Sequence, residues 1–369
     1  MYTAIIKLNP GGEEERDHSL LDKFKGGEVD IFTHHEGALE YKQIGEKGRL
    51  VLLNPSAKER QGEFLDQYVE CLIEFFHTQR RHPNLIYGDC PDGEYVAREV
   101  AAYFQIPQEG KRHFSPPESV VERMSSIEYL LISDFDNTLT GDHRAIEELK
   151  EILDIYYSKL GFAIATGRQI DSILDGLYQY DFPPPDTIIS AVGAQIFYGE
   201  ELYEDEGWAH YIKKNWNPQR VITLLEEFDE IDPQWLFTRE GESRVSYYID
   251  FVEDEELFVE QLKERLDAHQ LSYHLIFSHS HYLDVLPYRA SKGAAIDHVI
   301  GRWNLNPHQI ITAGDSANDL EMFTRNLKGI VVANHEEVLA SFRGQDHLFF
   351  SPSPFARGVI EGLHHFKVI

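Results

Sequence analysis

Four short polar motifs constrain the fold of this chain most strongly, because each lies where an apolar strand ends or a helix begins. They are DFDNT at 134–138, ATGR at 165–168, Lys292 within SKG, and GDSAND at 314–319. Apolar runs (LLIS, FAI and IITA) precede three of them and are typical of buried strands. A doubly wound parallel sheet binds ligands at the carboxyl ends of its strands. The motifs therefore predict a Rossmann-like α/β core with one polar site at that edge.

Asp134 and Asp136 are two carboxylates placed two residues apart, directly after a predicted strand. In an extended segment such residues share a face. One carboxylate can attack phosphorus, and a second can protonate the leaving oxygen and then deprotonate water. An acidic loop with a helix cap is the alternative interpretation of this pair taken alone.

The remaining motifs offer phosphate donors and metal ligands. The Thr166 hydroxyl and the Gly167 amide can donate to a phosphate oxygen, and Lys292 places an ammonium at the start of a helix. The GDSAND loop carries oxygen groups that suit Mg²⁺. Each motif alone also fits an ordinary turn or helix cap. All four together, in this order and at separate strand ends, favour phosphoryl transfer.

Composition excludes several other classes of protein. The net charge is -29, from 63 acidic and 34 basic residues, so nucleic acid and anionic membranes are not expected partners. No uncharged apolar run of about 18 residues is present, which argues against a membrane span. The two cysteines, Cys71 and Cys90, form neither a CxxC motif nor a disulfide framework. We therefore expect a cytoplasmic protein from a reducing compartment.

The alternation of apolar runs and helical patterns predicts two α/β domains, the second interrupted by an α+β insert. A segment rich in proline, glycine and charge, IPQEGKRHFSPPES at 106–119, predicts the linker between them. The predicted boundaries are 1–107 for the first domain, 108–126 for the linker, 127–196 and 282–369 for the core of the second domain, and 197–281 for the insert.

The four motifs resemble those of the haloacid dehalogenase superfamily of phosphatases, in order, residue type and strand context. The resemblance implies that the insert is a cap of the C2B type, which closes over the core and shapes the leaving-group pocket. It also implies a role for each site residue. Asp134 is the nucleophile and Asp136 the general acid and base; Thr166, Gly167, Lys292 and Asn318 bind the phosphate; Asp134, the Asp136 carbonyl, Asp315 and Asp319 hold or support Mg²⁺.

Longer segments over residues 128–369 are similar to the sucrose-phosphatase group, among them SAVGAQIFYG, FSHSHYLDVLPYRASKG and AGDSANDLEMF. The implied substrate is a disaccharide phosphate, sucrose 6-phosphate first. The implied sugar-binding positions are Arg168, Gln195, Arg244 and Tyr248. The last three differ from the acidic residue, lysine and histidine that the group leads us to expect, and such changes alter charge and fork geometry.

Other functions therefore stay open. The substrate can be a related glycoside phosphate, such as mannosylfructose phosphate or glucosylglycerol phosphate. The acceptor can be a second sugar instead of water, as in a phosphotransferase or mutase. A non-catalytic module that binds a synthase is a third possibility, although intact Asp134, Asp136, Lys292 and Asp315 argue against it.

The N-terminal part is similar to the acceptor-side half of retaining glycosyltransferases of the sucrose-phosphate-synthase type. The similarity lies in IKLNPGGEEERDHSLLDKF, EVDIFTH and the segment at 75–107. The donor-binding half should follow Pro107, but only a linker fits there, so we expect no transferase activity. The predicted role is self-association or docking of a cognate synthase, and a packing appendage with no role of its own is the alternative.

Overall fold

The computed structural model describes most of the second half of the chain and separate elements of the first part. The described residues are 2–8, 28–35, 38–43, 51–53, 69, 72–73, 86–88, 91–104, 117–233, 243–249, 252–278 and 280–369. Cys71, Cys90 and residues 108–116 of the predicted linker lie outside them. The chain divides into two compact units, Met1–Ser115 and Pro116–Ile369.

The first unit contains a mixed sheet built around its first strand. In the described residues, β1 pairs in parallel with three strands, and an antiparallel strand, which the sequence patterns did not indicate, extends the sheet beyond β2. The buried residues of α3 include Val96, Val100 and Tyr103. The similarity to a glycosyltransferase half stays a prediction. The elements are β1 Tyr2–Leu8, β2 Glu28–His35, β3 Ala38–Gln43, β4 Val51–Leu53, β5 Ile86–Gly88 and α3 Pro91–Tyr103.

The second unit is built on an eight-stranded sheet in the order β10-β9-β8-β7-β6-β15-β16-β17. The strands from β8 to β17 in this order run parallel, and β9 and β10 form an antiparallel edge. The strands are β6 Tyr129–Ser133, β7 Leu160–Ala165, β8 Thr187–Ser190, β9 Gln195–Tyr198, β10 Tyr203–Glu204, β15 Ile310–Gly314, β16 Lys328–Val331 and β17 Leu348–Phe350.

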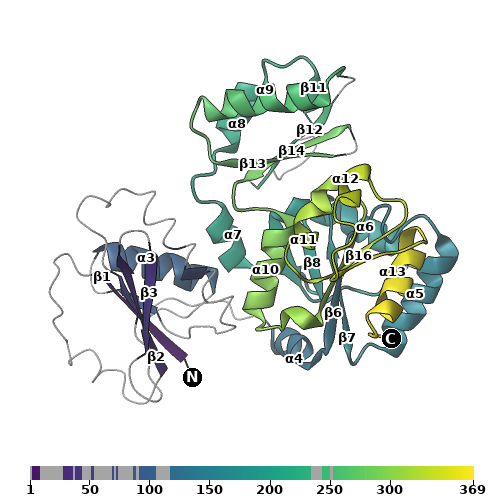
Figure 1. Ribbon diagram of the computed structural model, residues 1–369, viewed down its shortest axis with the longest axis horizontal. Helices are drawn as coiled ribbons and strands as arrows, with labels where there is room; N and C mark the ends of the chain where they lie inside the picture. The colour runs from purple at the N-terminus through teal and green to yellow at the C-terminus, as the bar shows by residue number, and fades with distance from the viewer. Residues whose placement is uncertain are drawn as a thin grey trace. The chain divides into compact units, whose positions relative to one another are not determined.

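Helices cover both faces of this sheet, with α5 and α13 on one side and α10 and α11 on the other (Figure 1). The side chains of Ile146, Leu149 and Leu153 lie on one face of α5 at helical spacing and are buried in the main apolar core. The helices are α4 Glu118–Ser126, α5 His143–Ile155, α6 Ile170–Gln179, α7 Glu206–Ile212, α10 Lys292–Arg302, α11 Leu320–Phe323, α12 Glu337–Ala340 and α13 Phe355–His365, with short 3-10 turns η1 Ala191–Gly193, η3 Pro307–Gln309 and η4 Ala317–Asp319.

The strand order of the sheet locates its ligand-binding edge. After β6, the chain continues to β7 and β8 on one side of it, and later returns to β15, β16 and β17 on the other side. The order therefore reverses between β6 and β15, and a doubly wound sheet binds ligands at such a switch point. The predicted doubly wound core is confirmed, and three of its motifs follow the adjacent strands β7, β6 and β15.

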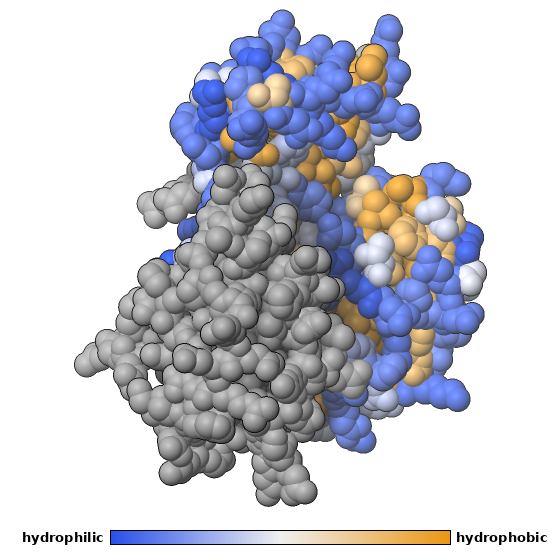
Figure 2. Space-filling view, turned by 60° about the vertical axis from the view of Figure 1, so that its left-hand side comes forward, coloured by the Kyte–Doolittle hydropathy of each residue, from blue (hydrophilic) through white to orange (hydrophobic). Residues whose placement is uncertain are grey.

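The insert forms a small antiparallel sheet, in the order β11-β12-β14-β13, with two helices on one face. Those helices lie on the side of the sheet that faces away from the core (Figure 1). The outer surface of this lobe, at the top of Figure 2, is mostly hydrophilic. The elements of this cap are α8 Pro218–Leu225, β11 Ile231–Pro233, β12 Val245–Ile249, α9 Glu255–Asp267, β13 Tyr273–Ser278 and β14 Tyr282–Pro287.

The cap begins and ends later than we expected from the sequence. Instead of leaving the core at residue 197, the chain adds β9 and β10 to the core sheet and continues into α7, whose Trp208 indole donates to the Gly193 carbonyl oxygen at 2.9 Å. Instead of resuming the core at residue 282, the chain first completes the cap sheet with β14. The apolar run in β14 belongs to a strand buried on both faces, a pattern that does not reveal which sheet contains it.

The predicted linker is also shorter than expected. Residues 118–126 form α4, which is attached to the core through Arg123. The guanidinium of Arg123 donates to both carboxylate oxygens of Asp186, at 2.7 and 3.0 Å, and to the carbonyl oxygen of Tyr157 at 2.5 Å. Any truncated protein meant to contain the second unit must therefore keep α4.

A buried polar network joins α7 to α10. The Asp205 carboxylate accepts from the Tyr198 hydroxyl at 2.9 Å and from the Trp208 amide at 2.8 Å, and lies 2.8 Å from His298 Nε2. Burial alone would raise the pKa of Asp205, but His298 and the hydrogen bonds outweigh it and lower the pKa to about 2 from its ordinary value of 3.8. The ionised carboxylate therefore stabilises the folded state.

Asp205→Asn should destabilise the second unit by roughly 2 to 3 kcal/mol at neutral pH. Because the folded-state pKa is depressed, this contribution is present above about pH 4 and disappears as the pH falls toward 2. All four tryptophans lie beyond residue 200, so tryptophan fluorescence during unfolding follows this unit alone. A difference between wild type and variant that stays constant from pH 5 to about 2 would contradict the assignment. Asp154→Asn, at an exposed position on α5, is the control.

Candidate active site

Asp134 lies immediately after the central strand β6 and is buried. Its amide donates to the Ala313 carbonyl oxygen at 2.8 Å, which continues the pairing of β6 with β15 by one residue. The chain then turns sharply, and Asn137 adopts a left-handed conformation with φ of 57°. The turn directs the Thr138 hydroxyl to Asp315, where it donates to Oδ1 at 2.7 Å. Two of the motifs are therefore hydrogen-bonded to one another.

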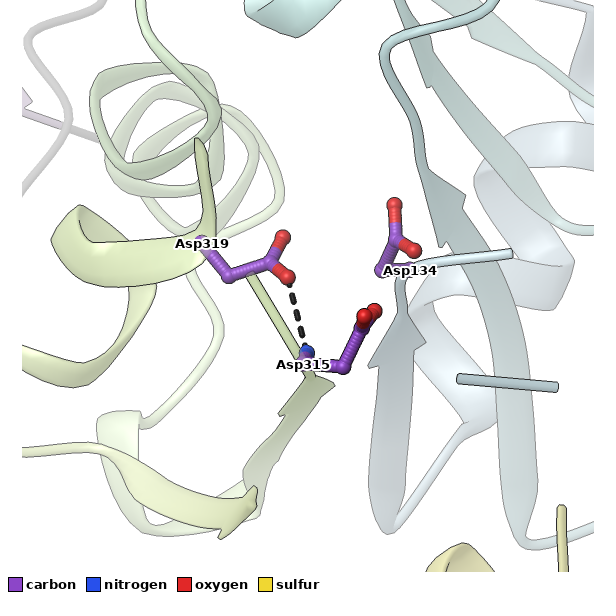
Figure 3. Close-up of side chains that lie close together, drawn as sticks. All are labelled: Asp134, Asp315 and Asp319. Atoms are coloured by element: carbon purple, nitrogen blue, oxygen red, sulfur yellow. Dashed lines mark hydrogen bonds between the residues drawn. The ribbon is translucent and has the colours of Figure 1, made fainter. Parts of the chain in front are cut away.

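Three carboxylates converge at this edge of the sheet, from Asp134, Asp315 and Asp319 (Figure 3). One oxygen from each lies within 4.8 Å of the other two, and all three residues are buried. Asp319 Oδ2 accepts from the amides of Asp315 and Ser316, at 2.9 and 3.0 Å, which fixes the loop after β15. A Cβ atom at Gly314 would lie 2.6 Å from Asp319 Cγ, so only glycine allows this close approach.

Lys292 supplies the positive charge of the cluster. It is the first residue of α10 and its side chain is fully buried. Its ammonium donates to Asp134 Oδ1 at 2.6 Å and to Asp319 Oδ1 at 2.7 Å. Burial alone would lower the pKa of Lys292, but the two carboxylates outweigh it and raise the pKa above its ordinary value. The lysine therefore stays charged in the folded protein.

The charges in this cluster do not balance. Three carboxylates converge on one ammonium, so acidic groups outnumber the ammonium in a buried site. Burial raises the pKa of Asp134 well above its ordinary value, and Asp319 and Asp315 add to the shift, although Lys292 opposes it. Buried carboxylates of this kind are normally paired or bound to a metal. The donor set, oxygen atoms from carboxylates, fits a divalent hard cation.

Asp136 does not join the carboxylate cluster. Its carboxylate is held by Arg168, which donates from Nε and Nη2 at 2.7 Å each. The third nitrogen of the guanidinium donates to the Ser172 carbonyl oxygen at 3.1 Å. Arg168 therefore holds Asp136, and its predicted role in sugar binding stays a prediction. The Asp136 side chain is 44% exposed, so it has room to rotate.

The predicted phosphate donors Thr166 and Gly167 follow β7, and Asn318 lies in the turn after β15. Thr166 is buried, and its hydroxyl oxygen accepts from the Arg168 amide at 3.0 Å. A Cβ atom at Gly167 would lie 3.7 Å from Asn318 Nδ2, so these two residues are neighbours across the switch point. The Asn318 amide is oriented by the Ser316 hydroxyl, which donates to Oδ1 at 3.2 Å. Their assignment to phosphate stays a prediction.

Among the predicted sugar-binding residues of the cap, Arg244 contacts the loop after β7. It immediately precedes β12, and its Nη1 donates to the Gly167 carbonyl oxygen at 2.6 Å. Gln195 begins β9, where its Oε1 accepts from the Ser190 hydroxyl at 3.2 Å. Tyr248 is 42% exposed and stacks on His281, with ring centroids 5.2 Å apart. No described contact joins Tyr248 to the core.

Residues that the sequence patterns did not indicate complete the surroundings of the site. Asp284 in β14 is buried, and it contacts Arg244 at 3.3 Å and accepts from the Ser246 hydroxyl at 2.5 Å. A carboxylate inside the otherwise apolar strand YLDVLP was the available signal. Glu336 accepts from the Ala317 amide at 2.6 Å and so fixes the turn that contains Asn318. No pattern in the local sequence indicates a functional role for Glu336.

A doubly wound core, an inserted α+β cap, and a buried cluster of aspartates and lysine at the switch point together define the haloacid dehalogenase class of phosphatases. The sequence matches the model of one family, sucrose-6F-phosphate phosphohydrolase, over residues 127–367. The chain therefore belongs to this family, and the resemblance noted from the motifs is confirmed.

Individual relatives agree with this assignment. Sucrose-phosphatase 1 of Nicotiana tabacum is 26% identical over 259 residues, which cover 66% of this chain and 60% of the relative. Mannosylfructose-phosphate phosphatase of Agrobacterium fabrum is 27% identical over 240 residues, which cover 64% of this chain and 96% of the relative. The solved structure of the sucrose-phosphatase of Synechocystis, in complex with sucrose and phosphate, is 30% identical with a TM-score of 0.60, covering 65% of this chain and 98% of that one.

In the part of the chain that the structure describes, every helix is too short or too polar to cross a bilayer.

Proposed function

We propose that this chain is a Mg²⁺-dependent phosphatase that hydrolyses a disaccharide phosphate, sucrose 6-phosphate first, through an aspartyl-phosphate. The observation that carries the proposal is the Lys292 ammonium held between the Asp134 and Asp319 carboxylates at the switch point. Membership of the sucrose-6F-phosphate phosphohydrolase family supports the same chemistry.

The cation would be held by the carboxylates of Asp134 and Asp315, with Asp319 close by. The Asp136 carbonyl is the further ligand that we propose. When bound, Mg²⁺ would offset negative charge on the three carboxylates and polarise a phosphoryl oxygen. It would also favour the ionised form of Asp134, which burial otherwise disfavours. The ionised carboxylate is a much stronger nucleophile toward phosphorus than the protonated acid.

The reaction would proceed in two displacements at phosphorus. Asp134 attacks, the bond from phosphorus to the sugar oxygen breaks, and Asp136 gives a proton to the departing alkoxide. Asp136 then takes a proton from water, which attacks the aspartyl-phosphate and releases phosphate and Asp134. Asp136 reaches the leaving oxygen by rotating away from Arg168, which holds it at the edge of the site. Lys292 offsets charge on the transferring group throughout.

The core-facing side of the cap sheet would recognise the sugar. Alternation along β12 places Val245 and Tyr247 in the apolar core of the cap, so Ser246 and Tyr248 face the opposite side. Asp284 lies on that same side of β14, where it contacts Ser246 and Arg244. A guanidinium, a carboxylate and hydroxyl groups offer donors and acceptors to sugar hydroxyls. We add Asp284 to the sugar-binding positions proposed from the sequence.

Arg244→Ala should raise KM for the preferred sugar phosphate about tenfold or more, since one charge-assisted hydrogen bond is worth roughly 1.5 to 3 kcal/mol. The same change should leave kcat/KM for p-nitrophenyl phosphate within about threefold, because that ester has no sugar hydroxyls. Arg220→Ala, on the outer helix α8, serves as the control. Equal losses on both substrates would assign Arg244 to the phosphate and not to the sugar.

A screen of sugar phosphates for release of free phosphate, with Mg²⁺ and with a chelator, tests the proposed function. Sucrose 6-phosphate is expected to give the highest kcat/KM, and chelation should abolish release. Mannosylfructose phosphate and glucosylglycerol phosphate are the competing substrates, because Gln195, Arg244 and Tyr248 depart from the residues expected for sucrose. Transfer of phosphate to another sugar would indicate a phosphotransferase or mutase, and no turnover of any ester would indicate a non-catalytic synthase-binding module.

For the first unit we propose self-association or docking of a glycosyltransferase that makes the substrate, inside the cytoplasm. The support is its similarity in sequence to half of such an enzyme and its separation from the catalytic unit. Proteins comprising residues 1–369 and 116–369 should have equal kinetics and should differ in oligomeric mass or in synthase binding. Identical behaviour in both assays would leave the unit as a packing appendage. A start at residue 116 keeps the Arg123 contacts intact.

A further inference from the structure

The residue before Lys292 fixes the start of the helix that carries it. Ser291 caps α10, and its hydroxyl oxygen accepts from the Ala294 amide at 3.0 Å. A serine hydroxyl has one proton to donate, and Ser291 gives it to the carboxylate of Glu321 on α11. The orientation of the Ser291 side chain, and with it the position of Lys292 as the first residue of α10, therefore depends on Glu321.

Glu321 is itself held in place by the core. Its backbone carbonyl accepts from Arg325 Nη1 at 2.5 Å, and its carboxylate accepts from Nη2 at 3.2 Å. Arg325 also donates to Asp297 on α10, at 2.6 Å. A Cβ atom at Gly293 would lie 2.7 Å from the backbone carbonyl oxygen of Glu321, so α10 and α11 approach as closely as glycine allows.

The inserted cap domain contacts the start of α10 and Glu321 through His274 on β13. Its Nδ1 lies 2.9 Å from the carbonyl oxygen of Ala290, the residue before Ser291. Because a carbonyl oxygen can only accept, Nδ1 is the donor of this hydrogen bond. Its Nε2 lies 3.5 Å from the second carboxylate oxygen of Glu321 and forms an ion pair with it when both ring nitrogens carry a proton. One carboxylate oxygen of Glu321 thus contacts β13 of the inserted cap, and the other accepts from Ser291, the residue that caps the N-terminus of α10.

We infer that Glu321 is a positioning residue through which the cap strand β13 acts on Lys292. The inference rests on the proposed function, in which Lys292 holds Asp134 and the transferring phosphoryl group. No described contact joins Glu321 to Asp134, and Glu321 acts on the site by fixing Ser291. When His274 is in place against Glu321, the helix start is fixed from both sides. A misplacement of about 1 Å at such a site can lower the rate about 100-fold, so small shifts of this helix start are enough to matter.

Glu321→Ala should lower kcat about tenfold or more on p-nitrophenyl phosphate and on the preferred sugar phosphate alike, with KM little changed. Glu321→Gln keeps an oxygen that accepts from Ser291, so it should recover most of the activity. Thermal unfolding followed by tryptophan fluorescence should show midpoints within a few degrees for both variants. Glu337→Ala, at an exposed glutamate on α12, is the matched control.

The link to the cap is tested by a double-mutant cycle with His274→Ala, measured as the affinity for orthovanadate in the presence of Mg²⁺. Each single change should weaken vanadate binding at least about threefold. In the Glu321→Ala background His274→Ala should add nothing, because His274 acts through Glu321. Additive effects would overturn the inference, as would wild-type affinity and kcat in Glu321→Ala.

These readouts separate the inference from the proposed function. If the wild type cleaves p-nitrophenyl phosphate and no sugar phosphate, the proposed substrate is wrong, and the Glu321 variants on the small ester still decide the inference. If it cleaves neither, the proposed function is wrong, and the vanadate cycle decides the inference, with failure of the wild type to bind vanadate overturning it as well.

Discussion

Asp134→Asn is expected to lower kcat by at least about 1000-fold on every phosphate ester that the wild type cleaves, because a neutral amide is a far weaker nucleophile toward phosphorus than a carboxylate. Several neighbouring groups remain in the variant, so substrate binding should persist. In particular, Lys292 keeps its contact with Asp319 at 2.7 Å. Steady-state phosphate release, together with KM or a direct binding measurement, separates the two effects.

The same change should leave the fold intact. Burial raises the pKa of Asp134, so the ionised form is disfavoured in the folded protein without metal, and a neutral amide of the same shape removes that penalty. The thermal midpoint of the variant should match or exceed that of the wild type when a chelator is present. Asp175→Asn, at an exposed position on α6, controls for the loss of a carboxylate. Activity above about a tenth of the wild-type level would exclude Asp134 as the nucleophile.

Lys292→Met has the second large expected effect, because it removes the ammonium that pairs with Asp134 and Asp319 in the three-carboxylate cluster. Breaking a buried ion pair by removing one partner costs about 3 to 5 kcal/mol. We expect a drop in the thermal midpoint, measured by tryptophan fluorescence with a chelator, and a loss of phosphate release of about 100-fold or more. Methionine keeps the length of the side chain, so lost packing contributes little.

Metal dependence gives this second prediction its sharpest test. In Lys292→Met three carboxylates remain without an ammonium, so a divalent cation should raise the thermal midpoint more in the variant than in the wild type. Activity should stay low even at saturating Mg²⁺, since the ammonium also offsets charge on the transferring group. Lys263→Met, on the outer helix α9, is the control. Equal stabilisation of both proteins by Mg²⁺ would contradict the charge balance derived for this site.

Local sequence patterns were sufficient to predict the strands that carry the site residues. Each apolar run ends in a polar motif, so the sequence predicted that Asp134, Thr166 and Asp315 follow buried strands, and the structure places all three at adjacent strand ends. The boundaries of the cap were predicted less well. In β14, alternation of buried residues is masked because both faces are covered, and pairing with β12 and β13 depends on residues far away in the chain.

Side-chain partners were mostly beyond the reach of the sequence. The resemblance implied a sugar-binding role for Arg168, which stays a prediction, and it did not indicate that the Arg168 guanidinium contacts Asp136, 32 residues away. Glu321 reads as an ordinary polar residue of a short helix, and its contacts with Ser291 and His274 span 30 and 47 positions. Such contacts arise from packing of distant elements, which no local pattern records.

For this protein the sequence by itself determined the class of chemistry, since the order and type of the motif residues place an aspartate, a lysine and oxygen ligands at one sheet edge. Only the tertiary structure decided which charges meet. It brings Lys292 to Asp134 and Asp319, keeps Asp136 apart, and joins the cap to the Lys292 helix through Glu321. The physical reason is that strand order follows from local apolar patterns, whereas the balance of buried charge depends on distances between side chains that only the folded chain sets.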